Sequence, residues 1–356
     1  MAKKGLSIST LNRVLKEGEQ WALCIGAGTS KFLIPDWKEL INKLIEDLSL
    51  PNKEKVDDIF ALGYSFDAII QAIKDMTGMD DKVFIEYLSD IIYSPIKNQL
   101  DDKEWIAFKT VHDWTIGYAS KDTTDHQERW DLFSECKERV FKNTTAYSLA
   151  KMLANGFSKG IKPSSILTFN GEACFLALLN SFLFDNNSHC IPKQFDRIIN
   201  SISDRGSTKI PYYHCHGTIP IKDVIYKKGY KANEKLVFSE DSYLQLANNN
   251  FSWQSSSFIN TCLHNKVVFI GVSLTDSNMR RWLSWIHHTK MKEMELNKMS
   301  FDIGKSTEHY WINVRPTEKK LQKWYESLVS LLGVRIIWIN KWSEAADALG
   351  IMLGII

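Results

Sequence analysis

The stretch WALCIGAGTS, residues 21–30, carries the strongest indication of the fold in this sequence. Five mostly apolar residues run directly into GAGTS, residues 26–30, and a helical pattern begins at Trp37. This order is typical of a buried strand, a tight turn and a helix, the first unit of a nucleotide-binding α/β sheet. Glycine has no Cβ, so Gly26 and Gly28 can adopt dihedrals closed to other residues and let a phosphate approach the main chain. The same pattern also occurs in turns that bind no ligand.

The composition is that of an ordinary globular protein. The chain has 356 residues, 44% hydrophobic and 24% charged, enough to bury one large core or two modest ones. The formal net charge of +2 gives no electrostatic reason to expect nucleic acid as the main partner. No stretch approaches the roughly 18 apolar residues of a membrane span, and the basic N-terminus has no apolar segment behind it, as a signal peptide would. We therefore expect a cytoplasmic location and no membrane partner.

The cysteines argue against both a disulfide framework and a four-cysteine zinc site, because no two of them form a Cys-x-x-Cys pair. They stand at positions 24, 136, 174, 190, 215 and 262. Cys24 and Cys174 lie within apolar runs and are predicted to be buried free thiols.

Two parts of the chain are predicted to be helical rather than mixed. Residues 5–19 place five apolar side chains at the spacing of one helical face. From about 50 to 160, glycine is sparse and apolar residues recur at helical spacing, so a helical insertion or subdomain is expected there. Its tryptophans, Trp105, Trp114 and Trp130, are interpreted as packing residues.

The rest of the chain alternates strands with helices. Strands are expected at residues 165–170, 209–215, 267–271, 310–314 and 334–339. Helices are expected at residues 172–184, 194–203 and 318–332, at 344–353, and from Ser239 and Asp276, with a polar hairpin at 221–235. Polar residues and glycines gather where the strands end, and ligands bind at that edge of open parallel sheets.

Four blocks of sequence carry a family resemblance. They are GAGTS with Ile34-Pro35-Asp36-Trp37, LTFNGE at residues 167–172, Cys215-His216-Gly217, and Gly271-Val272-Ser273-Leu274. In this order, over nearly the whole chain, they resemble the sirtuin-like (Sir2-type) domain, in the bacterial branch found in antiphage-defence NADases. Ile312-Asn313 and the segment 240–243 give weaker support. Each block alone is unspecific, but all four in sequence are much harder to obtain by chance.

The resemblance implies a single α/β domain over residues 1–356, with a Rossmann-like parallel sheet and the helical insertion, and NAD+ as substrate. It assigns catalysis to Asn170, which would bind a ribose hydroxyl and orient water, and to His216, which would act as general base. It assigns NAD+ binding to Gly26, Ala27, Gly28, Ser30, Asp36, Gly271, Ser273 and Asn313. No metal is expected, because His214 and His216 have no third ligand at a useful spacing.

The sequence departs from the sirtuin pattern in three respects. The loop from Ser30 to Ile34 is one residue shorter than usual, and Gly171 and Glu172 replace an apolar or tyrosine residue and an aspartate. Glutamate keeps the carboxylate but adds a methylene, which alters its reach. The deacetylase branch carries a structural zinc module of paired Cys-x-x-Cys, which this sequence lacks, so peptide deacylation is the less favoured activity.

Structural roles remain open for the same residues. Asn170 could cap the helix that follows it, and Asp36 and Asp276 could each cap a helix rather than contact a ligand. His216 could be a strand-end histidine without a catalytic role. Ser273 is a candidate for a phosphate or ribose contact.

The resemblance implies an NAD+ hydrolase that cleaves the nicotinamide–ribose bond and depletes NAD+ in antiphage defence by abortive infection. The α/β pattern runs to Ile356, so we expect no sensor domain on this chain. We expect control by self-assembly, as a homo-oligomer, or by a separate partner protein such as an ATPase or a nucleotide-sensing subunit. The alternative is a non-catalytic subunit of a defence complex that binds NAD+ or a related nucleotide.

Overall fold

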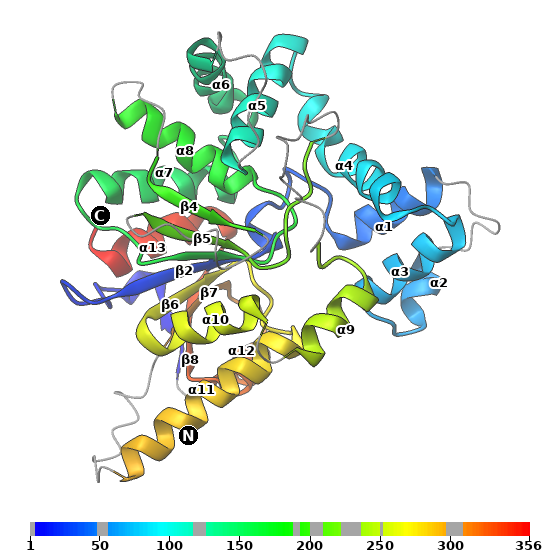
Figure 1. The fold of residues 1–356 in the computed structure, drawn as a ribbon. Helices are drawn as coiled ribbons and strands as arrows, with labels where there is room; N and C mark the ends of the chain where they lie inside the picture. Colours follow the sequence, from blue (N-terminus) through cyan, green and yellow to red (C-terminus); the bar gives the residue numbers. More distant parts are fainter. Residues whose placement is uncertain are drawn as a thin grey trace.

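A single parallel sheet organises the part of the chain that the computed structural model describes, which comprises residues 4–47, 56–116, 126–187, 193–199, 209–221, 236–249, 252–296 and 309–356. Its strand order is β1-β8-β7-β6-β2-β3-β5-β4. Every neighbouring pair in that order is parallel, and helices cover both faces (Figure 1). The prediction of a Rossmann-like α/β fold is confirmed.

The strands are β1 (Leu6–Ser7), β2 (Trp21–Ile25), β3 (Ile166–Thr168), β4 (Phe195–Ile198), β5 (Ile210–His214), β6 (Lys266–Ile270), β7 (His309–Val314) and β8 (Val334–Ile339). From β2 the chain builds outward through β3 and β5 on one side, and it returns to place β6 on the other side of β2. The direction of strand order therefore reverses between β2 and β6. In open α/β sheets, such a switch point leaves a crevice at the carboxyl ends of the strands.

Alternating side chains of the strands pack into two separate layers. Leu23 and Ile25 of β2 face the layer that contains α7 (Thr145–Ser158), α8 (Cys174–Asn186) and α13 (Ala345–Leu353). Ala22 and Cys24 face the layer of α10 (Trp253–His264), α11 (Ser277–Leu296) and α12 (Lys319–Ser330). This alternation follows from the two-residue period of a strand.

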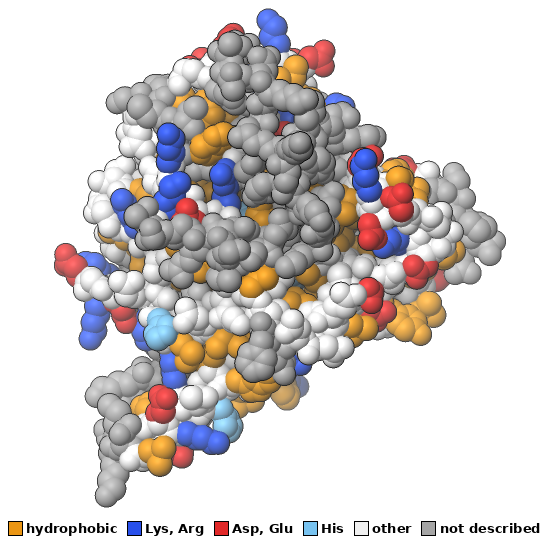
Figure 2. Space-filling view, in the orientation of Figure 1, with side chains coloured by type: hydrophobic (Ala, Val, Ile, Leu, Met, Phe, Trp, Pro, Cys, Tyr) orange, Lys and Arg blue, Asp and Glu red, His pale blue; other side chains and the backbone are white. Residues whose placement is uncertain are grey.

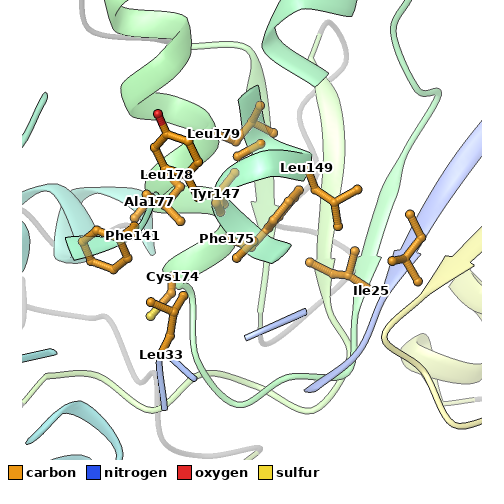
Figure 3. Packing of buried hydrophobic residues seen from close by; sticks show 14 of the residues in the cluster. Ile25, Leu33, Phe141, Tyr147, Leu149, Cys174, Phe175, Ala177, Leu178 and Leu179 are labelled. Atoms are coloured by element: carbon orange, nitrogen blue, oxygen red, sulfur yellow. The ribbon is translucent and has the colours of Figure 1, made fainter. Parts of the chain in front are cut away.

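The prediction that Cys24 and Cys174 are buried free thiols is confirmed. Figure 3 shows Cys174, in the first turn of α8, beside Leu33 of the loop that follows β2. Cys24 and Cys174 are both buried free thiols, and burial raises the pKa of each well above its ordinary value.

Helices fill the described residues between β2 and β3. They are α1 (Trp37–Asp47), α2 (Val56–Ala61), α3 (Phe66–Thr77), α4 (Asp81–Lys97), α5 (Asp102–Thr115), α6 (His126–Val140) and α7. The last of them, α7, packs against α8 and α13 and so belongs to the layer over the sheet. Trp114 and Trp130 pack edge to face, with ring centroids 5.3 Å apart, which confirms their interpretation as packing residues.

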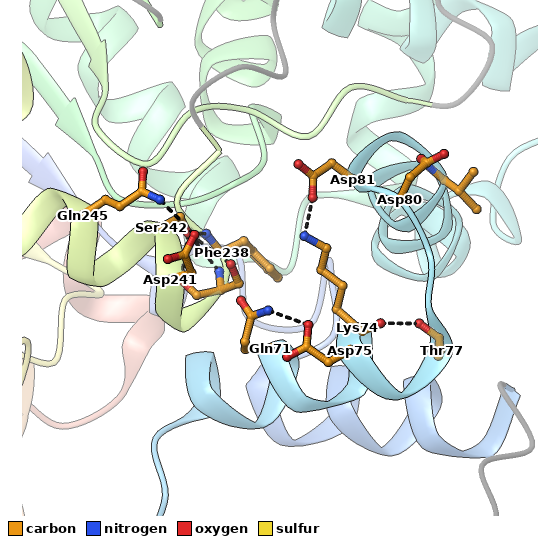
Figure 4. Close-up of polar contacts among 12 residues, drawn as sticks. Gln71, Lys74, Asp75, Thr77, Asp80, Asp81, Phe238, Asp241, Ser242 and Gln245 are labelled. Atoms are coloured by element: carbon orange, nitrogen blue, oxygen red, sulfur yellow. Dashed lines mark hydrogen bonds and ion pairs between the residues drawn. The ribbon is translucent and has the colours of Figure 1, made fainter.

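The helix α3 connects this group to the second half of the chain. It packs against α9 (Glu240–Asn248), and Figure 4 shows the two helices close together. Polar contacts within each element hold them in shape: Gln71 donates to Asp75 on α3, and Gln245 donates to Asp241 on α9. Ser239 and Ser242 form a capping box at the start of α9, as expected for a helix initiated by Ser239.

Two of the predicted helices are wrong. Residues 5–19 form β1 and a short 3-10 helix, Ile8–Thr10, because Leu6 pairs with Ile337 of β8 at the edge of the sheet. Within the predicted helix 194–203, residues 195–198 form β4, which pairs with β5. Short apolar runs do not distinguish strand from helix by period alone, so the distant sheet partner decides. The sequence also left α10 unpredicted, and residues 222–235 of the predicted hairpin lie outside the described residues.

Candidate functional site

Five residues in register on neighbouring strands form a row across the middle of the sheet, and most of the candidate residues follow directly after this row in the sequence. His214, Thr168, Ile25, Ile270 and Ile312 lie in register on β5, β3, β2, β6 and β7. Because these strands are parallel, the residues that follow the row all emerge at the same edge. Those residues include Gly26, Gly271 and Asn313 directly after it, Asn170 and His216 one position later, and Ser273 after them.

The turns after β2 and β6 are packed backbone against backbone. Gly26 donates its N–H to the Ile270 carbonyl at 3.0 Å, and Gly28 donates to the Gly271 carbonyl at 2.9 Å. A Cβ on Gly26 would lie 2.6 Å from the Gly271 oxygen, and Gly271 itself has φ +69°. Glycine is therefore required in both turns by their mutual approach. Ala27, at the tip of the first turn, is exposed.

A buried carboxylate ties the first turn to the end of β3. Glu172, 3% exposed, accepts from Ser30 Oγ at 2.5 Å and from Asn170 Nδ2 at 2.9 Å through its Oε1. Its Oε2 accepts from the backbone N–H of Cys174 at 2.5 Å, in the first turn of α8. Glu172 thus caps α8, a role that the sequence left open for Asn170. The sequence signal was an acidic residue two positions before an apolar helix.

Asn170 keeps one polar atom without a partner. Its amide nitrogen faces Glu172, as it must, because a carboxylate only accepts hydrogen bonds. Its Oδ1 is buried and has no hydrogen-bond partner among the described residues. An unsatisfied buried acceptor of this kind costs free energy, which a donor from a bound molecule would recover.

His216 follows β5 and lies among aromatic rings. Its half-buried imidazole contacts Phe169 edge to face at 5.0 Å, and Tyr243 of α9 at 5.7 Å. Burial lowers its pKa to about 4, against the opposing effect of a hydrogen bond with the Phe169 backbone. The ring is therefore neutral at pH 7 and can accept a proton. The sequence did not predict that Phe169 and Tyr243 lie beside His216.

Three aspartate and asparagine side chains form local hydrogen bonds. Exposed Asp36 accepts from the Glu39 N–H at 3.0 Å and forms a capping box on α1. Asp276 caps α11 by accepting from the Met279 N–H at 2.6 Å. Asn313 Oδ1 accepts from the Val314 N–H at 2.9 Å. The structure does not join Asp36 to the hydrogen bonds around Glu172 and Asn170.

Exposed Ser273 pairs its hydroxyl with that of Thr275 at 2.7 Å. It lies past the end of β6, on the same edge as the glycine turns. Its hydroxyl is accessible from outside the protein and remains a candidate ligand contact.

A buried tyrosine connects the helices of residues 56–116 to the segment after His216. Tyr93 on α4 donates its hydroxyl hydrogen to the Ile219 carbonyl at 2.7 Å and contacts His112 Nε2 of α5 at 3.0 Å. Burial raises the pKa of Tyr93 well above its ordinary value, so it remains a donor. Tyr93 and Ile219 are 126 positions apart, so sequence spacing does not predict this contact.

His214 is separated from His216 by its environment. It is fully buried beside Tyr212, and neither ring nitrogen has a hydrogen-bond partner among the described residues. Burial above all, and the electrostatic effect of the neighbouring His112 and Arg197, lower the pKa of His214 to about 3. No group of three or more His, Cys, Asp or Glu in the described ranges could hold a metal ion.

Because the pKa of His214 is lowered in the folded state, the free energy of unfolding should depend on pH. The unfolded chain binds a proton near the ordinary value of 6.5, whereas the folded chain does so only near 3, so folding loses stability as the pH falls below 6.5. Between pH 7 and pH 5 this single group should remove about 2 kcal/mol. His214→Leu should lose less stability than the wild type over that interval, measured by urea unfolding. Exposed His264→Gln should behave as the wild type, and identical losses in all three proteins would contradict the assignment.

Comparison with known families finds a match over part of the chain. Residues 177–331 match the family model described as SIR2-like domain. The matched segment includes β4 to β7 and the residues His216, Gly271, Ser273 and Asn313, and it begins after Asn170. No curated protein matches the chain. Among the described residues, no helix is both long and apolar enough to cross a membrane.

Proposed function

We propose that this chain, of which residues 177–331 match the SIR2-like domain, is an NAD+ hydrolase that cleaves the nicotinamide–ribose bond. SIR2-like domains use NAD+ as substrate. The observation that supports this proposal most is the presence of two suitable groups at the carboxyl edge of the sheet, after the neighbouring strands β3 and β5. One is the unpartnered amide oxygen of Asn170 and the other is the neutral imidazole of His216. A hydrolase of this bond needs a hydrogen-bond acceptor for the ribose and a base for water.

The reaction places modest demands on acid catalysis. The bond between C1′ of the ribose and the nicotinamide nitrogen breaks, and its electron pair leaves with nicotinamide, which departs neutral. Water then forms the new C1′–O bond and gives up a proton. In our proposal Asn170 Oδ1 accepts from a ribose hydroxyl or from the water, and His216 takes the proton. A positioned base of this kind contributes about 10²–10⁴-fold in rate.

The turns after β2 and β6 suit the pyrophosphate of NAD+. The backbone N–H groups of Gly26, Gly28, Thr29 and Ser30 donate to protein carbonyls, so the turn offers a phosphate the main chain at its exposed tip, Ala27, and tight turns of this kind hold phosphates without side-chain charge. The turn continues into a 3-10 helix, Ala27–Thr29, and α1 begins only at Trp37. In our proposal the main chain at Ala27, rather than the dipole of a long helix, makes this contact.

Nicotinamide release from NAD+ by the purified chain tests the proposal. Asn170→Ala should lower kcat/KM by about 100-fold or more, because the ribose and the water lose their acceptor. Exposed Asn98→Ala serves as a matched control and should keep the wild-type rate. Wild-type kinetics in Asn170→Ala would remove Asn170 from the active site. Binding of NAD+ without any release, under all conditions of concentration and partner, would favour the regulatory subunit instead.

We also propose that this activity serves antiphage defence by depleting NAD+ in the infected cell, under the control of assembly or of a partner protein. Bacteria that express the chain should lose NAD+ after phage infection, and those that express Asn170→Ala should not. The NAD+ content of infected and uninfected cultures measures this directly. Equal NAD+ content in both cultures, for an active enzyme, would contradict the role in defence.

A further inference from the structure

The helix α12 presents an apolar stripe to the surface. Leu321, Trp324, Leu328 and Leu331 are exposed, with Trp324 60% and Leu331 74% accessible. On the other side of the helix, Val329 and Leu332 pack into the core beneath the sheet. Figure 2 shows hydrophobic side chains gathered on the surface in the region where Figure 1 places α11 and α12. The outer face of α12 is thus apolar, although the helix already packs against the core through its inner face.

The stripe has the spacing of a helix-pairing seam. Its members follow one another at intervals of three, four and three residues, which are the a and d positions of a heptad. A helix that only covers a sheet needs this pattern on its inner face. On the outer face the pattern predicts a second helix of similar length.

The charges of α12 indicate the direction of that second helix. Lys319 and Lys320 occupy the first turn and Lys323 follows, while acidic Glu318 stands at the N-cap and makes no side-chain capping hydrogen bond. The N-terminus of a helix carries partial positive charge, so these lysines are unfavourably placed in a single copy. An antiparallel neighbour would bring the negative C-terminal end of its own helix beside them.

We propose that α12 is the two-fold interface between two copies of this chain. In an antiparallel register centred on Glu326, Leu321 packs on Leu331 of the partner subunit and Trp324 packs on Leu328 of the partner subunit. Each contact then occurs twice, as a two-fold interface requires. The register also places Lys319 and Lys320 next to the carbonyl end of the opposite helix. This inference does not depend on the proposed enzymatic activity.

The available area predicts how tightly the copies bind. The stripe and neighbouring Tyr325 are between 39% and 74% exposed, and an aromatic side chain buries about 150–250 Å² when fully covered, a leucine somewhat less. Two copies would together bury on the order of 1,000 Å², at the lower end of specific interfaces. We therefore expect a dimer that dissociates at concentrations on the order of micromolar.

Light scattering on the full chain between about 1 and 100 µM tests the interface. The wild-type mass should rise from 41.0 kDa to twice that value over this range. Trp324→Glu should remain at 41.0 kDa throughout and keep the wild-type Tm, because the side chain is exposed. Met76→Glu changes an equally exposed apolar residue on α3 and should still dimerise.

Cysteine cross-linking tests the register. A mixture of Leu321→Cys and Leu331→Cys chains should form a disulfide-linked pair, and neither variant should do so alone. A parallel pairing would instead link Leu321→Cys to itself. Self-linking of either variant, a wild type that stays monomeric at 100 µM, or a dimer unaffected by Trp324→Glu would each overturn the proposal. Binding of the monomer to anionic lipid vesicles through Trp324 would also overturn it.

Discussion

Replacing His216 with Ala should lower nicotinamide release from NAD+ by about 10²–10⁴-fold. The imidazole is neutral at pH 7 because burial lowers its pKa to about 4, so it is the group placed to take a proton from water. Its ring contacts with Phe169 and Tyr243 are peripheral to the core, so the variant should fold. Steady-state kinetics at pH 7 and the binding of NAD+ by calorimetry measure the two effects separately, and binding should be retained.

The pH profile adds an independent check on His216. A base with a pKa of about 4 remains deprotonated from pH 5 to pH 8, so the wild-type rate should be flat over that interval and fall as the pH passes below about 4. Exposed His264→Ala should leave rate and profile unchanged. Full activity in His216→Ala would exclude the ring as the base, and a rate that falls through pH 6.5 would show an imidazole with an ordinary pKa.

Glu172→Gln should affect both stability and rate. Three donors, Ser30 Oγ, Asn170 Nδ2 and the Cys174 N–H, converge on the carboxylate. Glutamine offers one acceptor oxygen and turns an N–H₂ group toward another donor, which leaves buried groups unsatisfied at about 1–3 kcal/mol each. We expect unfolding in urea to show a loss of about 2–5 kcal/mol. The rate should fall about 10-fold or more, because Asn170 loses its orientation.

A double-mutant cycle separates the two roles of Glu172. If the carboxylate acts on the rate through Asn170, then Glu172→Gln should cost little further activity in a chain that already carries Asn170→Ala. The loss of stability at the start of α8 should persist in that background. Glu344→Gln, at a half-buried carboxylate that accepts from the Asn340 N–H, is the matched control. Additive losses of rate in the double variant would show that Glu172 does not work through Asn170.

The central strands could be predicted from local pattern. The apolar runs 21–25 and 267–270 lie between two helical layers and are hydrophobic on both faces, so their burial is visible in the residues themselves. The glycines and polar residues after them could be placed at one edge because parallel strands end on the same side. Edge strands carry no such signal, since half of their environment is solvent, and β1 and β4 were predicted as helix.

The roles of individual side chains were harder to predict from the sequence. Asp36 and Asp276 carry the residue type of both a helix cap and a ligand contact, and their hydrogen bonds to Glu39 and Met279 show the cap. Asn170 was open between cap and ligand contact, and Glu172 takes the cap. Such choices turn on which donor lies within about 3 Å, and a sequence does not contain that distance.

By itself, the sequence determined the parallel α/β fold and the edge at which its polar residues gather, because both follow from periods and turns of a few residues. Only the tertiary structure decided what those residues contact. Ser30 meets Glu172 across 142 positions, and Gly26 and Gly28 meet Gly271 across the switch point. The burial that lowers the pKa of His216 and leaves the ring nitrogens of His214 without a hydrogen-bond partner among the described residues is likewise made by distant elements. Desolvation and hydrogen bonding depend on neighbours in space, and folding brings those neighbours from segments far apart in the chain.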